Sequence, residues 1–113
     1  MEDSVVYKIL SRDELDAFKL TGAFTGAGAD SQDGFIHLSS ASQVAGTVER
    51  YFHGRSDILI LAVDTSGFGP SLRWEASRGG ALFPHLYGVL PYEAVLAAGP
   101  VEYLEDGRLK LPQ

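Results

Sequence analysis

The run Asp33-Gly34-Phe35-Ile36-His37-Leu38-Ser39-Ser40 decides how the rest of the sequence is interpreted. In an extended chain successive side chains point to opposite faces, so Phe35, His37 and Ser39 share one face. Ile36 and Leu38 occupy the other face. One aliphatic face and one face with a ring, an imidazole and a hydroxyl indicate two environments. We therefore expect a strand over 34–39 whose aliphatic face packs in the core while the other face looks into a cleft.

Composition places this run in a single globular domain. The chain has 113 residues, of which 45% are hydrophobic and 21% charged, and we expect one domain over 1–113 with its core at about 5–104. Cysteine is absent, which excludes disulfides and cysteine-ligated metals. The net charge of −6 disfavours general binding to nucleic acid. No apolar run is long enough for a membrane span, and the acidic N-terminus is unlike a signal peptide, so we expect a cytoplasmic protein without membrane contact.

Before the central run, the sequence predicts a strand, a helix and a loop. Val5–Leu10 is rich in β-branched and aromatic residues, which favours a strand. Ser11-Arg12-Asp13-Glu14 has the spacing of a capping box, in which a serine and a glutamate bond each other's backbone at a helix start. Gly22 is a natural end for that helix. The small residues of Thr25–Asp30 predict a surface loop, and they lack the glycine spacing of a dinucleotide-binding turn.

After the central run, the pattern again alternates between helix and strand. Ser40-Ala41-Ser42-Gln43 offers a second capping-box spacing before a helical stripe that includes Val44 and Val48, with Gly54 as its end. The nearly uniform apolar run Asp57–Asp64 is typical of a central strand buried on both faces. Leu72–Glu75 predicts a short strand or bend.

The last third of the chain predicts short strands joined by turns. Pro84 keeps the aromatic segment Phe83–Gly88 from forming a helix. Two strands are expected at 95–98 and 101–104, separated by Gly99-Pro100, and Asp106-Gly107 is a hairpin signal. With about two main helices and five to seven strands, the fold class is α+β.

Seven polar or titratable residues stand out because each lies within or beside an apolar stretch, where a polar side chain needs a partner. They are Lys8, His37, Ser39, Arg73, Glu75, His85 and Tyr87.

Each of these residues has a structural alternative beside its functional one. His37 either donates to a ligand or is satisfied by a backbone carbonyl, and Ser39 either lines a site or caps a helix. Arg73 and Glu75 alternate around Trp74, which fits either a surface ion pair or charges set in a cleft. Glu75 is the best candidate for an acid or an electrostatic stabiliser.

His85 and Tyr87 face the same way if their segment is extended. They either stack on a planar ligand or pack under a loop.

Metal and nucleophile chemistry are poorly supported. His37, His53 and His85 have no short ligand spacing, so no metal site is predicted. The sequence contains neither the G-x-S-x-G turn of serine hydrolases nor a phosphate-binding Walker A loop.

The phrases G-F-I-H-L-S (34–39) and F-P-H-L-Y-G (83–88), with Tyr7–Leu10, Gln43 and Leu72–Glu75, carry a family resemblance. Over about residues 7–100 the chain resembles a small bacterial family known as domain of unknown function 952. The name carries no activity. The family is grouped with ADP-ribosyltransferase-like folds, so the resemblance implies a split, mostly antiparallel sheet with two main helices.

The same resemblance implies candidate roles for individual residues. Phe35–Ser39 and the helix after it are similar to the V-H-L-S motif of RNA 2′-phosphotransferases, and Leu90–Val95 is similar to a late V-P turn in those enzymes. Lys8 stands where the first motif of such folds usually carries histidine, and Ile9 replaces the glycine that follows it.

If the chemistry of those folds is retained, the reaction is cleavage of the nicotinamide–ribose bond of NAD. His37 would then contact a ribose hydroxyl or the nicotinamide amide, Glu75 would stabilise the positive charge that develops, and Tyr87 would stack. The third motif of these folds aligns nearer His85 than Glu75, so the choice between the two for that role stays open.

Three hypotheses follow. The first is a ribosyl transferase or glycohydrolase-like enzyme acting on NAD or a related nucleotide. Its catalytic residues would be His37 and Glu75, and its ligand-binding residues would be Lys8, Ser39, Arg73, His85 and Tyr87. The second is a non-catalytic module that binds a nucleotide or another small ligand on the same fold. The third is a protein-interaction domain whose cleft is closed by Phe83 and Tyr87. NAD is the only cofactor or substrate that the resemblance implies, and the sequence identifies no protein partner.

Overall fold

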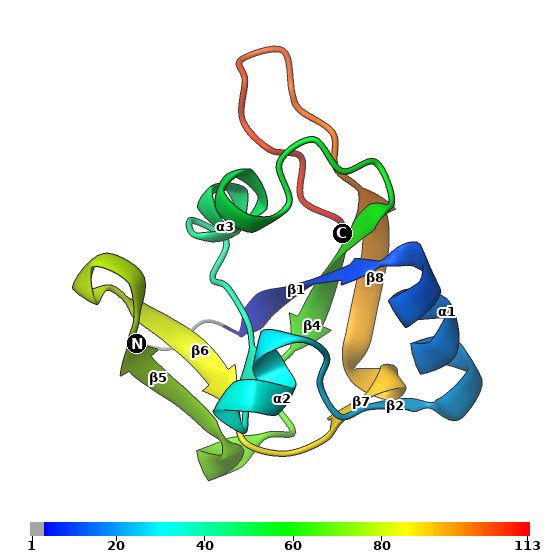
Figure 1. Cartoon of the computed structure of the whole chain (residues 1–113), viewed down its shortest axis with the longest axis vertical. Helices are drawn as coiled ribbons and strands as arrows, with labels where there is room; N and C mark the ends of the chain where they lie inside the picture. Colours follow the sequence, from blue (N-terminus) through cyan, green and yellow to red (C-terminus); the bar gives the residue numbers. More distant parts are fainter. Residues whose placement is uncertain (1–3) are drawn as a thin grey trace.

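The computed structural model describes residues 4–113, apart from the side chain of residue 78, and has an α+β fold (Figure 1). Its helices and strands, in chain order, are β1 (Val5–Ser11), α1 (Arg12–Thr21), β2 (Ala23–Phe24), α2 (Ala29–Asp33), β3 (Ile36–His37), α3 (Val44–Tyr51), β4 (Ile58–Asp64), η1 (Gly69–Ser71), β5 (Leu72–Ala76), η2 (Arg78–Gly80), β6 (Leu82–Leu86), β7 (Leu90–Pro91), η3 (Tyr92–Ala94) and β8 (Val95–Pro100).

The strands form antiparallel sheets of different size. The central sheet has the order β1-β4-β8, and a second three-stranded sheet has the order β3-β6-β5. The two-residue strands β2 and β7 pair with each other. In Figure 1, β5 and β6 extend to one side of the central sheet and α1 lies on the other. The α+β class with mostly antiparallel sheets is confirmed.

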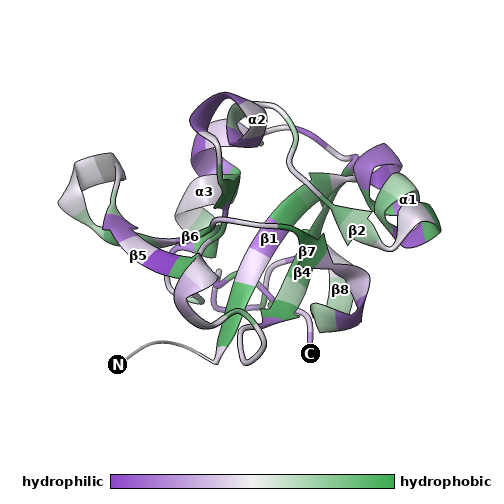
Figure 2. Ribbon diagram, turned by 90° about the horizontal axis from the view of Figure 1, so that it is seen from below, coloured by the Kyte–Doolittle hydropathy of each residue, from purple (hydrophilic) through white to green (hydrophobic). Residues whose placement is uncertain are grey.

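The central sheet is buried on both faces because two hydrophobic clusters cover it. One face of β1 contributes Val6 and Leu10 to a cluster with Phe18 of α1 and Ile36 of β3. The opposite face contributes Tyr7 and Ile9 to a cluster that includes Val44 and Val48 of α3. Figure 2 shows the resulting hydrophobic residues along β1 and β4 and hydrophilic residues on α2 and β5. The prediction of a central strand within 57–64 is therefore confirmed.

The predicted start and end of the first helix are also confirmed. The Glu14 backbone N–H donates to Ser11 Oγ at 3.1 Å, and the Ser11 backbone N–H donates to a Glu14 carboxylate oxygen at 2.8 Å. Gly22 adopts φ +80°, a left-handed conformation that costs glycine little, and its N–H donates to the carbonyl of Phe18 at 2.8 Å. Local sequence chemistry alone specifies both ends of α1.

The second capping box forms only in part. The Ser40 backbone N–H donates to Gln43 Oε1 at 3.0 Å, but the Ser40 hydroxyl meets Ser42 Oγ instead of the backbone. The amide of Gln43 also donates to the carbonyl of Leu82 at 2.7 Å, which ties the start of α3 to β6. The helix begins at Val44, and its last residue, Tyr51, comes before Gly54. Gln43 therefore takes part in the local cap through Oε1 and in a tertiary contact through its amide nitrogen.

The prediction of a surface loop over Thr25–Asp30 is wrong at its end. Residues Ala29–Asp33 form the short helix α2, and Asp30 is only 4% exposed. Gly26 has φ +121°, and a Cβ atom there would lie 3.0 Å from Cβ of Asp30. The loop needs glycine because it folds closely over a buried carboxylate.

The predicted strand over 34–39 is also shorter than expected. Only Ile36 and His37 pair with β6, while Ser39 forms an isolated bridge with Tyr7 of β1. The segment therefore leaves one sheet and joins the edge of another within two residues. Ile36 and Leu38 are buried, so the expected aliphatic face is confirmed.

The C-terminal strands differ from the prediction as well. Val95–Pro100 is one continuous strand through Gly99-Pro100, because β8 lies at the edge of the central sheet, where proline can be accommodated. Residues 101–104 contribute only the bridge between Tyr103 and Leu109 around the predicted Asp106-Gly107 turn. Across the described residues the structure has eight strands and three α-helices, which is more than the sequence predicted. The difference arises because the sequence predicted neither the strand pair β2–β7 nor the helix α2.

Candidate functional site

A cleft of about 550 Å³ opens where β1, α2, β3, α3 and β6 meet, and we call it the main cleft. Four of the seven predicted site residues line it, namely Lys8, His37, Ser39 and His85. Arg73, Glu75 and Tyr87 are not among the residues that line it. His37 and Ser39 of the unusual face of the 34–39 run therefore line a hollow, but Phe35 of that face does not, and Leu38 of the aliphatic face does.

The floor of the main cleft is a charged network around Asp30. The Lys8 ammonium donates to Asp30 Oδ2 at 2.9 Å and to the carbonyl of His37 at 3.0 Å. The other oxygen, Oδ1, accepts from His37 Nδ1 at 2.6 Å and from the His37 backbone N–H at 2.9 Å. The Ala27 backbone N–H donates to Oδ2 at 3.2 Å. Asp30 thus fixes the backbone and ring of His37 and neutralises Lys8.

The register of β1 explains why a lysine is buried here. Lys8 lies between Val6 and Leu10 on the face of β1 that packs toward β3, and it pairs across the sheet with Leu61. Lys8 is 8% exposed, so its ammonium needs a buried partner. The N-terminal half of α2 supplies that partner as Asp30.

The environment of Asp30 keeps it ionised. Burial acts to raise the pKa of Asp30, but the charge of Lys8 lowers it, as do the hydrogen bonds from His37 and Lys8. The net result is a pKa below the ordinary value of 3.8. The carboxylate can therefore hold the Lys8 ammonium and the His37 ring across the neutral pH range.

This lowered pKa predicts how folding stability depends on pH. Because the pKa of Asp30 is lower in the folded chain than in the unfolded chain, its stabilising effect is fully present above the unfolded value near 3.8. The effect is lost as the pH falls from there through the folded pKa. We expect thermal denaturation followed by circular dichroism to give a steeper loss of Tm below pH 4 for the native chain than for Asp30→Asn. Equal slopes below pH 4 would contradict the assignment.

The outer side of His37 is held more loosely than the inner side. Its Nε2 atom lies 2.9 Å from Asp33 Oδ2, at the C-terminal end of α2. The Asp33 side chain is 50% exposed, whereas that of Asp30 is buried. A ligand oxygen can take the place of Asp33 without disturbing the bond between His37 and Asp30.

Ser39 does not cap α3. Its hydroxyl lies 3.1 Å from Thr47 Oγ1 within that helix, and its backbone pairs with Tyr7. Both hydroxyls belong to the wall of the main cleft. Ser39 therefore joins β1 to α3 and lines the cleft, which is the functional alternative left open for it.

The remaining predicted residues form a second cluster next to the main cleft. His85 Nδ1 lies 2.8 Å from Glu75 Oε1, and the Tyr87 hydroxyl donates to the same oxygen at 2.8 Å. The Arg73 guanidinium lies 4.5 Å from the centre of the Tyr87 ring. Phe35 stacks on His85 with ring centres 4.1 Å apart. His85 is the member of this cluster that reaches the cleft.

The hydrogen bonds of the second cluster shift two pKa values. The bonds from His85 and Tyr87 lower the pKa of Glu75 more than its partial burial raises it. The bond to Glu75 is the main cause of a raised pKa for Tyr87. Glu75 is therefore a carboxylate that accepts two hydrogen bonds, and it is not among the residues that line the main cleft.

The charges that line the main cleft nearly cancel. Lys8 is paired with Asp30, and Arg55 donates two hydrogen bonds to Asp57, at 2.7 and 3.0 Å. The cleft also holds the carboxylates of Glu14 and Asp33. A ligand therefore meets a mixed surface with no cluster of unpaired cations among the described lining residues.

Sequence reasoning missed Asp30 and Asp33, which hold the two nitrogens of His37. The usable signal was the unexplained Lys8, because a lysine inside an apolar strand requires a carboxylate partner. Nothing in the sequence selected Asp30 from among the other acids. The contact depends on how the 25–30 loop folds over β1, which is a tertiary property.

The third histidine lies apart from this site. His53 follows α3 and contacts Glu49 at 3.1 Å on the surface. In residues 4–113, as far as they are described, no group of three or more candidate ligands is arranged to hold a metal ion.

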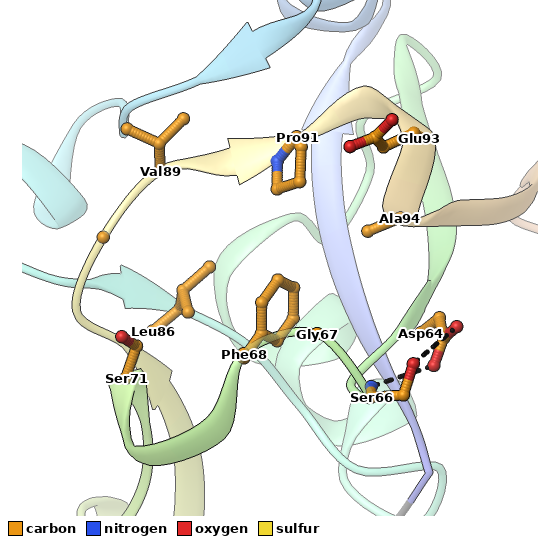
Figure 3. Close-up of a pocket in the computed structure, with 11 residues that line it drawn as sticks. Asp64, Ser66, Gly67, Phe68, Ser71, Leu86, Val89, Pro91, Glu93 and Ala94 are labelled. Atoms are coloured by element: carbon orange, nitrogen blue, oxygen red, sulfur yellow. Dashed lines mark hydrogen bonds between the residues drawn. The ribbon is translucent and has the colours of Figure 1, made fainter.

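A smaller hollow of about 400 Å³ lies elsewhere on the molecule (Figure 3). Phe68, Leu86 and Pro91 line it, and at its edge Ser66 donates from its backbone N–H and hydroxyl to the carboxylate of Asp64. Asp64 is engaged by this local turn, while Ser71 and Glu93 also line the hollow. Among the described residues, no helix is long and apolar enough to cross a membrane.

Comparison with known proteins gives one family and close structural relatives. The model of a family described as "protein of unknown function (DUF952)" matches residues 9–98. The chain is similar to the crystal structure of protein CC0527 from Caulobacter crescentus, with 45% identity and a TM-score of 0.83 over 96% of this chain and 93% of that one. The solution NMR structure of CC0527 gives 45% identity and a TM-score of 0.79, covering 93% and 90%. No curated protein matches the chain.

Proposed function

The chain belongs to the DUF952 family of proteins of unknown function, and we propose that its main cleft binds a small nucleotide-like molecule through His37. The observation that carries this proposal is the fixed position of the His37 ring on buried Asp30 at the floor of a cavity of about 550 Å³. Natural ligand sites are cavities of roughly 300–1,000 Å³ with mostly apolar walls and a few oriented polar groups.

The lining of the main cleft suits a ligand with one planar part and one hydroxyl-rich part. Phe24, Leu10 and Phe83 supply apolar wall, which can pack against a heterocyclic base. His37, Ser39 and Thr47 supply polar groups. A ligand hydroxyl or amide that replaces Asp33 at His37 Nε2 would be held by a ring whose other nitrogen is already fixed. Nucleosides and nucleotides combine these two features.

The finer assignment, an ADP-ribosyltransferase-like fold whose ligand is NAD, is part of the same proposal. Its support is the order of elements and the position of the cleft between β1 and β3, where the Tyr7–Ser39 bridge joins the two sheets. The position of Glu75 outside the cleft favours binding over cleavage of the nicotinamide–ribose bond by the predicted pair His37 and Glu75. A protein-interaction domain is less well supported, because Phe83 lines an open cleft and Tyr87 lies beyond it.

We expect NAD, ADP-ribose and a nucleoside such as adenosine to shift the NMR signals of His37 and Ser39 in a saturable way. His37→Asn keeps a donor for Asp30 but loses Nε2, so we expect its affinity for the best of these probes to fall by about tenfold or more. His53→Asn is the matched control, because His53 lies outside the cleft. The absence of shifts at the cleft residues with every probe at millimolar concentration would remove the proposal.

The same samples separate binding from cleavage. Incubation with NAD followed by measurement of free nicotinamide should show no release above that of buffer if the chain only binds. Release that His37→Asn and Glu75→Gln both abolish would establish the glycohydrolase alternative instead.

A further inference from the structure

His85 occupies the central strand of the second sheet and is surrounded on three sides. It pairs across the strands with His37 on β3 and with Arg73 on β5. Its Nδ1 contacts Glu75 from β5, and Phe35 stacks on its ring face. The residue is 5% exposed, yet it lines the main cleft. His85 therefore meets the cleft with only a small part of its ring.

Nε2 is the ring nitrogen of His85 that the contact with Glu75 leaves unoccupied. Nδ1 is directed to Glu75, which does not line the cleft, and Nε2 lies on the other side of the ring. Among the described residues, Nε2 has no hydrogen-bond partner, and Trp74 Nε1 is the only fully buried side-chain nitrogen or oxygen without one. Nε2 therefore keeps some exposed surface, and His85 lines the main cleft.

The contact with Glu75 determines what Nε2 can do. A carboxylate oxygen only accepts, so the 2.8 Å contact requires a proton on Nδ1. In the neutral ring Nε2 then carries the lone pair. The Tyr87 hydroxyl donates to the same Glu75 oxygen, and Arg73 lies over the Tyr87 ring, so the carboxylate stays ionised and fixed. A histidine held by a carboxylate at one nitrogen and open at the other has the geometry of a general base.

We propose that His85 is the general base of the main cleft and that Glu75 positions it, so that the cleft activates water or a ligand hydroxyl. In this step Nε2 takes the proton from the oxygen as that oxygen forms a bond to an electrophilic carbon. The bond to the leaving group breaks with its electron pair, and the proton then passes from the imidazolium to the leaving group or to solvent. The substrates are molecules with a carbon centre that can be hydrolysed.

This inference goes beyond binding and does not depend on a nucleotide ligand. It gives Glu75 a different role from the one predicted for it, because Glu75 acts through His85 and not on the ligand. A merely structural His85 would also bond Glu75 and would have the same tautomer, but it would not need an accessible Nε2.

Two measurements on the full chain test the proposal. Nitrogen-detected NMR of the imidazole groups should show the neutral form of His85 with its proton on Nδ1. Hydrolysis of p-nitrophenyl acetate, a small activated ester, should be accelerated by the chain. His85→Asn keeps a donor near Glu75 but removes the base, so we expect it to lower this acceleration by about a hundredfold.

The control variants distinguish the loss of a general base from a loss of folding. His53→Asn should retain the native rate, because its imidazole is exposed and remote. Glu75→Gln should populate both tautomers of His85 and lower the rate by about tenfold with an unchanged amide NMR fingerprint, and a purely structural His85 would not produce this loss of rate. A proton on Nε2 in the native chain, or a native rate in a folded His85→Asn or Glu75→Gln, would overturn the proposal. Neither result bears on whether NAD or adenosine binds the cleft.

Discussion

Replacement of Asp30 by asparagine is expected to destabilise the chain by about 3–5 kcal/mol, because it leaves the Lys8 ammonium buried without a counter-charge. Asp30 and Lys8 are 4% and 8% exposed, so water cannot take over the role of the carboxylate. Asparagine is nearly the same size, which confines the change to charge and to the bonds that Asp30 accepts from Lys8 and His37. A loss of this size is a large part of the total stability of an ordinary domain. Urea unfolding monitored by circular dichroism measures it.

Asp33→Asn is the matched control for this prediction. Asp33 also contacts His37, but its side chain is half exposed, and exposed ion pairs contribute roughly 0–1 kcal/mol. We therefore expect its midpoint of unfolding to stay close to that of the native chain. If the two variants lost equal stability, burial would not explain the contribution of Asp30, and the prediction would be wrong.

A double variant tests whether the loss comes from the unpaired charge. Lys8→Met retains the apolar stem of Lys8 and removes its ammonium. Combined with Asp30→Asn, it leaves no unpaired cation at the Lys8 position, and replacement of a buried ion pair by apolar groups is often close to neutral. We expect the double variant to be more stable than Asp30→Asn alone. A sum of two independent losses would instead show that the ion pair itself contributes little.

The parts of the fold that could be predicted are those that local chemistry specifies. The capping box at Ser11 and the glycine at position 22 define α1, and the apolar run within 57–64 defines the central strand β4. In each case the deciding interactions lie within a few residues, or the burial is complete on both faces. Tertiary contacts therefore do not alter these elements from what the local sequence predicts.

The parts that could not be predicted are those where two distant segments compete for the same groups. The backbone of Ser39 pairs with Tyr7, 32 positions earlier, and this ends β3 after two residues. The 25–30 loop has the composition of an exposed turn, yet it places Asp30 against Lys8. Neither contact leaves a periodic pattern in the sequence.

The candidate site shows the same division. The sequence identified His37, Ser39, Lys8 and His85 because each is a polar residue in an apolar segment, and all four line the main cleft. It placed Glu75 in the cleft because alternation puts Glu75 on the same face as Arg73. The structure instead uses that face to bring Glu75 to His85 Nδ1. Whether a residue on that face of β5 reaches the main cleft depends on the surrounding tertiary structure. The alternation of residues in the sequence does not describe that structure.

The second large loss of stability is expected on replacement of Leu61, a core residue of β4 that lies next to Lys8 of the main cleft. Leu61 is fully buried in β4 and pairs with Lys8 on one side and with Ala98 on the other. Leu61→Ala removes three carbon atoms and leaves a cavity, and such changes in cores cost about 2–5 kcal/mol. Leu20→Ala is the matched control, because Leu20 is 88% exposed on α1 and its truncation should change stability by less than about 0.5 kcal/mol.

The location of Leu61 makes the result informative about the cleft as well as the core. It belongs to the hydrophobic cluster that supports β3, the strand that carries His37. Because cores are close-packed, a cavity at Leu61 should loosen the support of β1 and β3 together. We therefore expect hydrogen exchange to accelerate at the His37 backbone N–H, which donates to Asp30, more than at the Gly22 N–H that ends α1. Equal acceleration at both sites would mean that the cleft and α1 open as a single unit.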